Sequence, residues 1–246
     1  MTLVSSGPIS LAGTATSGGL NQSIQKELGG SGSSTISLND AAVRGLLGVA
    51  SGAIGITGGY GKAAFTPHND DFTTPGSSSI NVPAGASQLV LEVWGGSGSG
   101  GNGATGSGDH QGAGGSAPGY AKSVFALVSG DWGKTISLVV GAIGAASSTS
   151  GSALNAGSVA ITANGGATGT NATGTTNGAA VTGGTATGGN TTNTTGASST
   201  AGNSAGTAGQ GAAANNGWGV GGQGGYSVSN TGKTNGVNGR VKFTWT

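Results

Sequence analysis

Two short stretches of the sequence place histidine beside carboxylates, the residue types that most often bind metals or transfer protons. His68, Asp70 and Asp71 form the first cluster, and Asp109 and His110 form the second. Neither has a further type of ligand at a spacing that would complete a metal site, so we predict none. The HNDD stretch precedes a Pro–Gly turn signal and is interpreted as a solvated linker. Asp109 and His110 lie within a glycine-rich tract, where they form either an ordinary polar loop or a receptor contact.

Other patterns associated with catalysis lack an essential part. G-x-G-x-x-G occurs at 96–101 and 98–103, but more glycine follows in place of the helix that a dinucleotide site needs. Gly133–Lys134–Thr135 resembles the end of a phosphate-binding loop, yet the glycine required five positions earlier is Val128. The 7 carboxylates are scattered and none follows Asp131, so no glycosidase-like acid pair can be nominated. We predict that the protein is not an enzyme and holds no cofactor.

Two large aromatic residues stand among glycines in the stretch GWGVGGQGGYS. These residues, Trp218 and Tyr226, have little neighbouring side-chain surface against which to pack. They either contact a receptor or glycan, or pack back onto the edge of the folded domain or a neighbouring subunit. The candidate receptor-binding residues are therefore Asp109, His110, Trp218 and Tyr226.

The composition restricts what can hold the chain together. The 246 residues include 57 glycines, charged residues make up only 6%, and the formal net charge is +1. Between residues 162 and 217 the only apolar side chain larger than alanine is Val181, and residues 135–232 carry no charge. Such a stretch has too little apolar surface to offset the entropy of ordering glycine. It is either disordered or held together mainly by backbone hydrogen bonds.

The composition also excludes several classes of partner. Basic residues are few and spread out, so no nucleic-acid partner is expected. There is no cysteine, and hence no disulfide framework. The N-terminus lacks the basic start and apolar run of a secretory signal, and no stretch approaches about 18 apolar residues. We therefore expect synthesis in the cytoplasm without a signal peptide and without membrane insertion.

Residues 1–62 carry helical periodicity. Two apolar stripes predict two short helices. The first stripe has apolar residues at i, i+4 and i+8, and the second places its apolar residues on a single helix face. Helices this short are marginal alone, so their apolar faces need the second domain or another copy of the chain. The candidates for docking or oligomer contacts are Leu20, Ile24, Leu28, Val43, Leu46 and Leu47.

From about residue 63 the apolar period changes to two, which predicts strands. The terminal RVKFTWT is the clearest, because Val241, Phe243 and Trp245 alternate with polar residues. VSGDWG, at 128–133, is interpreted as a hairpin connection. Further strands are predicted at 79–82, 88–94, 120–127, 134–140 and 159–161.

These elements predict a mainly β fold: a short N-terminal helical segment, 1–62, followed by a small antiparallel β-sandwich domain over 63–246. The apolar strands leave two long glycine-rich loop excursions between them, 95–119 and 164–239. Because the last strand must return to complete the core, the second excursion is tied down at both ends.

Two segments resemble a known class of proteins. The N-terminal stretches GPISL, ISLNDAAVRGLL, SGAIG and YGK resemble a short segment that recurs in tailed-phage structural proteins. The stretch TTPGSSSINVPAGASQLVLEVWGG, with the closing GGQGGY and NGRVKF, resembles the glycine-rich β-domain of phage tail fibres and tail-tip proteins. Together they cover roughly residues 1–125 and 217–246.

The resemblance implies a virion protein of the tail fibre, tail tip or baseplate, made in the host cytoplasm. Its partners would be other phage tail proteins and a host cell-surface receptor, protein or glycan, and tail symmetry implies a homotrimer. Host attachment is the preferred role, and a purely architectural virion role is the alternative. A polyglycine-II or ice-binding protein is a more distant alternative, and a glycan depolymerase the least favoured one.

Distal adhesins of T-even phages are also similar in using glycine-rich tracts, which they pack as polyglycine-II helices. Such packing needs glycine near every third residue so that chains can approach closely. Between residues 165 and 211 the glycine spacings are irregular. We therefore expect polyglycine-II packing only locally.

Overall fold

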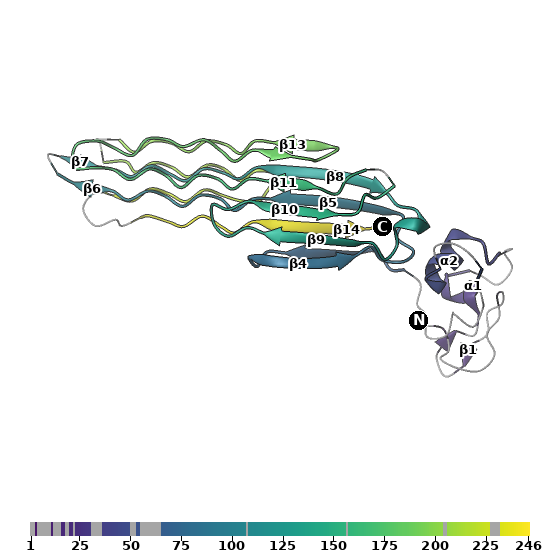
Figure 1. Ribbon diagram of the computed structural model, residues 1–246. Coiled ribbons are helices and arrows are strands. Elements are labelled where there is room, and N and C mark those ends of the chain that lie inside the picture. The colour runs from purple at the N-terminus through teal and green to yellow at the C-terminus, as the bar shows by residue number, and fades with distance from the viewer. Residues whose placement is uncertain are drawn as a thin grey trace.

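The computed structural model describes residues 65–246 apart from 107, 156, 204–205 and 227–231. Before residue 65 it describes 3, 11, 16–17, 20–21, 23–30, 36–49 and 53–54. The chain forms three parts: an N-terminal segment, a β-sandwich, and a long glycine-rich bundle that extends from the far end of the sandwich (Figure 1).

The N-terminal segment builds a small apolar cluster of its own. A hairpin of β1 (Thr16–Ser17) and β2 (Leu20–Asn21) precedes the helices α1 (Ile24–Glu27) and α2 (Ala41–Leu47). The Ser23 hydroxyl accepts a hydrogen bond from the Lys26 N–H at 3.1 Å and caps α1. The buried cluster is formed by Leu3, Ile24, Val43, Leu46 and Leu47, with Leu28 packed against it.

This cluster changes the argument for an oligomer. The apolar stripes of the two short helices were expected to need the second domain or another copy of the chain. Ile24, Val43, Leu46 and Leu47 are instead buried within their own segment, and Leu28 is partly buried there. The side chain of Leu20 lies outside the described residues. The homotrimer therefore stays a prediction, without the support that unburied helices would have given it.

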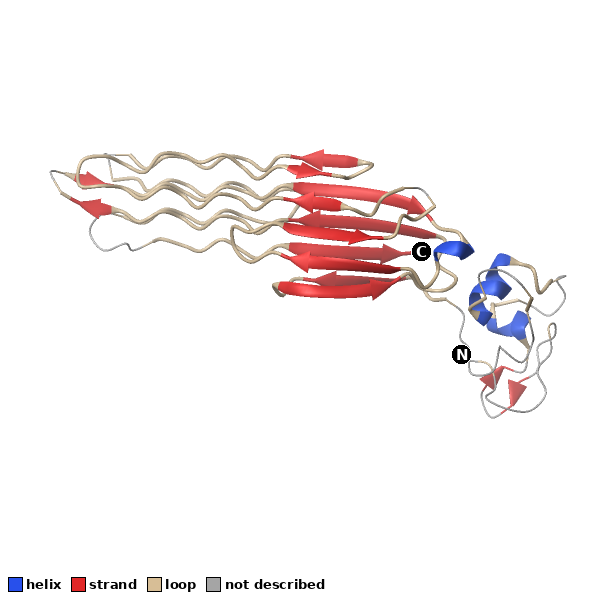
Figure 2. Ribbon diagram, in the orientation of Figure 1, coloured by secondary structure: helices blue, strands red, loops and turns tan. Residues whose placement is uncertain are grey.

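The sandwich consists of two five-stranded antiparallel sheets, confirming the mainly β fold (Figure 2). One sheet has the order β13-β8-β5-β14-β3 and the other β12-β11-β10-β9-β4. The strands are β3 (His68–Phe72), β4 (Gly76–Asn81), β5 (Gln88–Trp94), β8 (Tyr120–Ala126), β9 (Thr135–Val140), β10 (Ser147–Gly151), β11 (Ile161–Ala163), β12 (Ala186–Thr187), β13 (Thr192–Thr194) and β14 (Arg240–Trp245).

The core lies between the two sheets and is built by strict alternation. Every second residue of β14 is fully buried and pairs across to β5, with Phe243 opposite Leu91. β9 supplies the facing side chains of the second sheet. The last strand thus closes a core in which the preceding buried side chain is that of Ala163, in β11. The largest core side chains are Leu89, Leu91, Phe125, Ile136, Leu138, Ile161, Phe243 and Trp245.

The linker interpretation of HNDD is wrong, because these residues form the edge strand β3. Asp71 makes two hydrogen bonds with the Arg240 guanidinium, at 2.8 and 2.6 Å. Asp70 accepts the indole N–H of Trp245 at 2.7 Å. Charged residues suit an edge strand since they discourage pairing with other chains. The partner strand lies far along the sequence, so local periodicity could not reveal this pairing.

The VSGDWG stretch is not a hairpin connection either. β8 belongs to one sheet and β9 to the other, so the chain crosses between sheets through the 3-10 turn η2 (Ser129–Asp131). None of the helices in the described part of the chain has the length and apolar character needed to cross a membrane.

Candidate functional site: the glycine-rich bundle and its distal tip

The glycine-rich segments leave the sandwich and return to it four times. Figure 2 shows them as long, nearly parallel runs outside the strands. We call these runs the bundle. Its segments are 95–103, 111–119, 164–172, 178–185, 196–202, 208–215, 219–226 and 233–239.

Segment 111–119 occupies the centre of the bundle, and all of its residues are buried. Its backbone N–H groups donate to three different neighbours in turn, with a period of three residues. Gly112 and Gly115 donate to Gly225 and Gly222, at 3.0 and 2.6 Å. The next two pairs follow the same rule: Ala113 and Ser116 donate to Thr170 and Ala167, and Gly114 and Ala117 donate to Thr200 and Ala197.

The carbonyl groups of the same segment face three further neighbours. They accept hydrogen bonds from the segments 95–103, 178–185 and 208–215, at spacings of three or six residues. Segment 111–119 therefore has six neighbours around it, as expected for packed helices of three residues per turn. Backbone hydrogen bonds between segments, rather than apolar burial, hold the bundle together. The packing extends further than the irregular glycine spacing predicted.

Most inward positions of the bundle are occupied by glycine, and many of these glycines have no room even for a methyl group. A Cβ atom at Gly98 or Gly115 would lie less than 3.0 Å from a neighbouring carbonyl oxygen. Alanine or serine occupies some inward positions. The inward residues recur every third position within a segment, but each turn changes where the next series of three begins. The repeat is visible in the buried sets Gly166, Gly169 and Ala172; Gly196, Ser199 and Gly202; and Gly209, Ala212 and Asn215.

Pro118 fits this hydrogen-bond pattern because it has no N–H. The pairs Gly112–Gly225 and Gly115–Gly222 would place the next donor, residue 118, opposite Gly219. The proline ring packs against Gly219 instead, where a side chain would collide with it. Its carbonyl accepts the side-chain N–H of Asn215 at 3.0 Å.

The outer turns of the bundle gather around one buried residue, Gln111, which is only 2% exposed. Its N–H donates to the side chain of Asn177 at 2.9 Å, and its carbonyl accepts from Gly178 at 2.8 Å. Gly202 packs directly against the same carbonyl, and Gly225 is bonded to the adjacent Gly112. The turns therefore form one surface, which we call the distal tip: residues 102–110, 173–177, 203–207 and 226–233, as far as they are described.

The distal tip holds three of the four predicted receptor-binding residues. Asp109 and His110 form β7 (Asp109–His110), which pairs with β6 (Ala104–Thr105) at the end farthest from α1 and α2 (Figure 1). Tyr226 starts the last turn, is 37% exposed and follows Gly225, the partner of Gly112. The structure thus brings Asp109, His110 and Tyr226 to one end of the molecule.

Trp218 lies at the opposite end of the bundle and packs back onto the sandwich. The Arg240 guanidinium lies over its ring, 4.9 Å from the centroid, and 5.3 Å from that of Trp94. The Trp218 indole N–H donates to the Asn238 carbonyl at 2.9 Å. Of the two alternatives for this residue, the structure shows packing against the folded domain.

Sequence reasoning missed two polar residues at the tip. Lys233 donates from its ammonium group to the Asn102 side-chain carbonyl at 2.7 Å. The bundle segments and their turns contain two formal charges, Asp109 and Lys233, and both lie at the tip. A count of charges along 95–119 and 164–239 could have singled out these positions. The flanks of the bundle are uncharged.

Asp131 is the other carboxylate with an unusual environment, but its contacts are structural. It is 1% exposed and accepts hydrogen bonds from the Lys134 ammonium at 2.8 Å and from the N–H groups of Val128 and Asn155. Burial acts to raise its pKa, but these hydrogen bonds outweigh burial and hold the pKa below its ordinary value. Its role is to fix the crossing between the sheets. Among the described residues, no group of three or more His, Cys, Asp or Glu could hold a metal ion.

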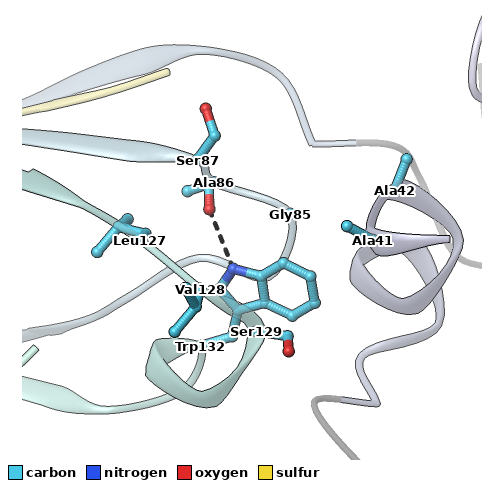
Figure 3. A pocket seen from close by; sticks show the side chains of 9 residues that line it. All are labelled: Ala41, Ala42, Gly85, Ala86, Ser87, Leu127, Val128, Ser129 and Trp132. Carbon is cyan, nitrogen blue, oxygen red and sulfur yellow. Dashed lines mark hydrogen bonds between the residues drawn. The ribbon is translucent and has the colours of Figure 1, made fainter. Parts of the chain in front are cut away.

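An apolar cleft of about 490 Å³ separates α2 from the sandwich (Figure 3). Trp132 forms one wall, and its indole N–H is already bonded to the Ala86 carbonyl at 3.0 Å. Beside the cleft, α2 touches the sandwich through Gly45, where a Cβ atom would lie 2.7 Å from the Gly85 Cα and 3.1 Å from the Trp132 ring. Glycine weakens a helix interior, so this close approach explains its presence there.

We expect Gly45→Leu to undock the N-terminal segment from the sandwich. The larger side chain cannot fit against Gly85, so about 1–3 kcal/mol of docking free energy should be lost. Limited proteolysis should then cut between the two parts at least about fivefold faster. Ala41→Leu is the control, because its side chain can enter the neighbouring cleft, and its proteolysis rate should not change. Equal rates for both variants would contradict the docking role of Gly45.

No protein-family model and no curated protein matches this chain.

Proposed function

We propose that the protein is a structural component of a phage tail, in a fibre, tail tip or baseplate, and that it displays the distal tip to a receptor on the host cell surface. The observation that carries this proposal is the convergence of the outer turns around Gln111, at the end farthest from the N-terminal segment (Figure 1). The N-terminal segment would attach the protein to other tail proteins.

The distribution of chemical groups supports display rather than catalysis. The flanks of the bundle present small uncharged side chains, whereas the carboxylate of Asp109, the imidazole of His110 and the ammonium of Lys233 lie at the tip. The one deeply buried carboxylate of the described residues, Asp131, has its oxygens occupied by internal hydrogen bonds. The resemblance of residues 1–62 and 73–94 to phage structural proteins agrees with this proposal.

The bundle suits this role because its rigidity does not depend on the packing of large apolar side chains in a core. Backbone hydrogen bonds between the segments hold them in place, so turn residues can vary without disturbing the scaffold. A tip built on such a scaffold is held in one geometry before it meets its partner. Less conformational entropy is then lost on binding.

The test is the binding of fluorescently labelled full-length protein to a panel of bacterial strains. We expect the triple variant Asp109→Ala, His110→Ala, Tyr226→Ala to bind at least about tenfold more weakly to any strain that the wild type binds. The matched control carries Thr182→Ala, Val220→Ala and Val237→Ala on the exposed flanks of the bundle and should bind normally. Wild-type protein that binds no strain, or a triple variant that binds as well as the wild type, would contradict tip-mediated attachment.

A further inference from the structure

We propose that the distal tip recognises a glycan. This inference rests on the proposed attachment function and specifies the chemical class of the receptor. The sugar would stack on Tyr226 and form hydrogen bonds with Asn102 and Lys233. Tyr226 and Lys233 flank the same turn, and the bundle brings Asn102 next to them from a distant part of the sequence.

The backbone of the bundle places the three side chains next to one another. Gly225 donates a hydrogen bond to the Gly101 carbonyl at 2.8 Å, so the residues that follow them, Tyr226 and Asn102, leave the bundle side by side. Lys233 lies on the returning segment and bonds to Asn102 at 2.7 Å. One aromatic ring, one amide and one ammonium group therefore share a small area of the tip.

The surroundings of Tyr226 leave its ring available to a ligand. Gly232 packs against the Cδ2–Cε2 edge of the ring, and a Cβ atom at this position would lie 2.7 Å from Cε2. Because glycine has no side chain, it leaves Tyr226 exposed, at 37% for the whole residue. An exposed aromatic ring offers an apolar face for the C–H groups of a sugar, and its hydroxyl can exchange hydrogen bonds with the sugar hydroxyls.

The polar groups fit a polyhydroxylated ligand. The ammonium group of Lys233 has three N–H donors, of which Asn102 accepts one, and the Asn102 amide can both donate and accept. Sugar hydroxyl and carboxylate oxygens are suitable acceptors for these donors. The other exposed tip side chains are also hydroxyls, amides or small charged groups, including Thr105, Asp109, Thr173, Thr175, Asn203 and Thr207.

The apolar side chains that protein partners commonly use as anchors are found elsewhere. The exposed large hydrophobic residues of the described chain other than Tyr226 are Val128, Val139, Ile143, Val220 and Val237. These belong to the sandwich or to the flank of the bundle near it. Protein interfaces usually centre on clustered aromatic and apolar residues, and the described tip has one isolated ring. The tip therefore favours a glycan over a protein receptor.

The experiment compares labelled wild-type protein on cells of a bound strain after two treatments. Periodate cleaves the vicinal diols of sugars, and a broad protease removes exposed protein. We expect periodate to abolish binding and protease to leave it unchanged. The reverse pattern would overturn the glycan proposal while leaving tip-mediated attachment in place. Failure of the wild-type protein to bind any untreated strain would overturn both.

Two variants test the role of Tyr226 independently of the cell treatments. Tyr226→Ala should weaken binding about tenfold because the stacking surface is lost. Tyr226→Phe keeps the ring and should remain within about threefold of the wild type. Both substitutions are at an exposed position, so the thermal unfolding of each variant should match that of the wild type. Equal losses for the two variants would contradict ring stacking, and equal wild-type-like binding would remove Tyr226 from the site.

Discussion

Gly115→Ala should destabilise the protein by about 3 kcal/mol, the upper end of the usual cost of overpacking a well-packed interior. Gly115 lies in the central segment of the bundle, where a Cβ atom would collide with the carbonyl oxygen of Gly98. The obstacle is backbone rather than a flexible side chain, so one segment must move away. Moving it also weakens the hydrogen bond from Gly115 to Gly222 and the bond that Gly115 accepts from Ala212.

The matched control for this substitution is Gly174→Ala in an outer turn. A Cβ atom there would make only ordinary contacts, 3.6 Å from the Gly106 Cα. Alanine also lowers the entropy of the unfolded chain, so this variant should be unchanged or more stable by up to about 1 kcal/mol. Chemical denaturation of both variants measures the difference. Similar stabilities would show that the centre of the bundle is not packed as described.

Asp131→Asn is the second substitution with a large expected effect, a loss of about 3 kcal/mol at neutral pH. The carboxylate is buried and accepts hydrogen bonds from Lys134, Val128 and Asn155. Asparagine has nearly the same shape, but it removes the charge opposite Lys134 and turns a donor group toward N–H donors. Chemical denaturation at pH 7 measures the loss.

The same interaction predicts how the loss depends on pH. The folded protein holds the pKa of Asp131 below its ordinary value of 3.8. The carboxylate therefore adds stability above pH 3.8, and this contribution is lost as the pH falls through the lower folded-state pKa. The difference in stability between wild type and Asp131→Asn should shrink below pH 3.8. A difference that stays constant down to pH 2 would assign the effect to packing alone.

The strands with apolar alternation could be predicted from sequence because burial on one face leaves a clear pattern. RVKFTWT and QLVLEVW are the best examples, and both lie where expected, as β14 and β5. β10 was missed because its inward residues are hydroxyl side chains. Ser147 and Thr149 are buried and bond to the Gly141 N–H at 2.9 Å and the Val159 carbonyl at 2.6 Å. A hydrophobic pattern cannot register such a strand.

The bundle was predicted only in part, for a different physical reason. Glycine spacing alone looked irregular, because Ala172 and Ser199 take inward positions that glycine was expected to hold. Counting small residues and allowing each turn to reset the phase recovers the period of three. The central position of segment 111–119 could not be predicted, since it depends on long-range pairing of backbone groups that carry no side-chain signal.

The candidate site could also be predicted only in part from the sequence. Asp109, His110 and Tyr226 are predictable from the sequence as unusual residues within glycine-rich tracts, and the structure places them at the same end. Trp218 is a candidate for the same reason, but its ring packs against Arg240 at the edge of the sandwich. Asn102 gave no local signal, because its relation to Tyr226 depends on the segments that the bundle brings together. Lys233 could have been found only by a count of charges along the glycine-rich tracts.

Amide hydrogen exchange of segment 111–119 tests the ordered bundle most directly. Its N–H groups are buried and bonded to the surrounding segments, so those of residues 112–117 should exchange only when the whole domain unfolds. The exposed residues of the tip turns should exchange far faster in the same protein. Exchange of residues 112–117 at the rate of an unstructured peptide would contradict the packed bundle, and with it a tip held in place for recognition.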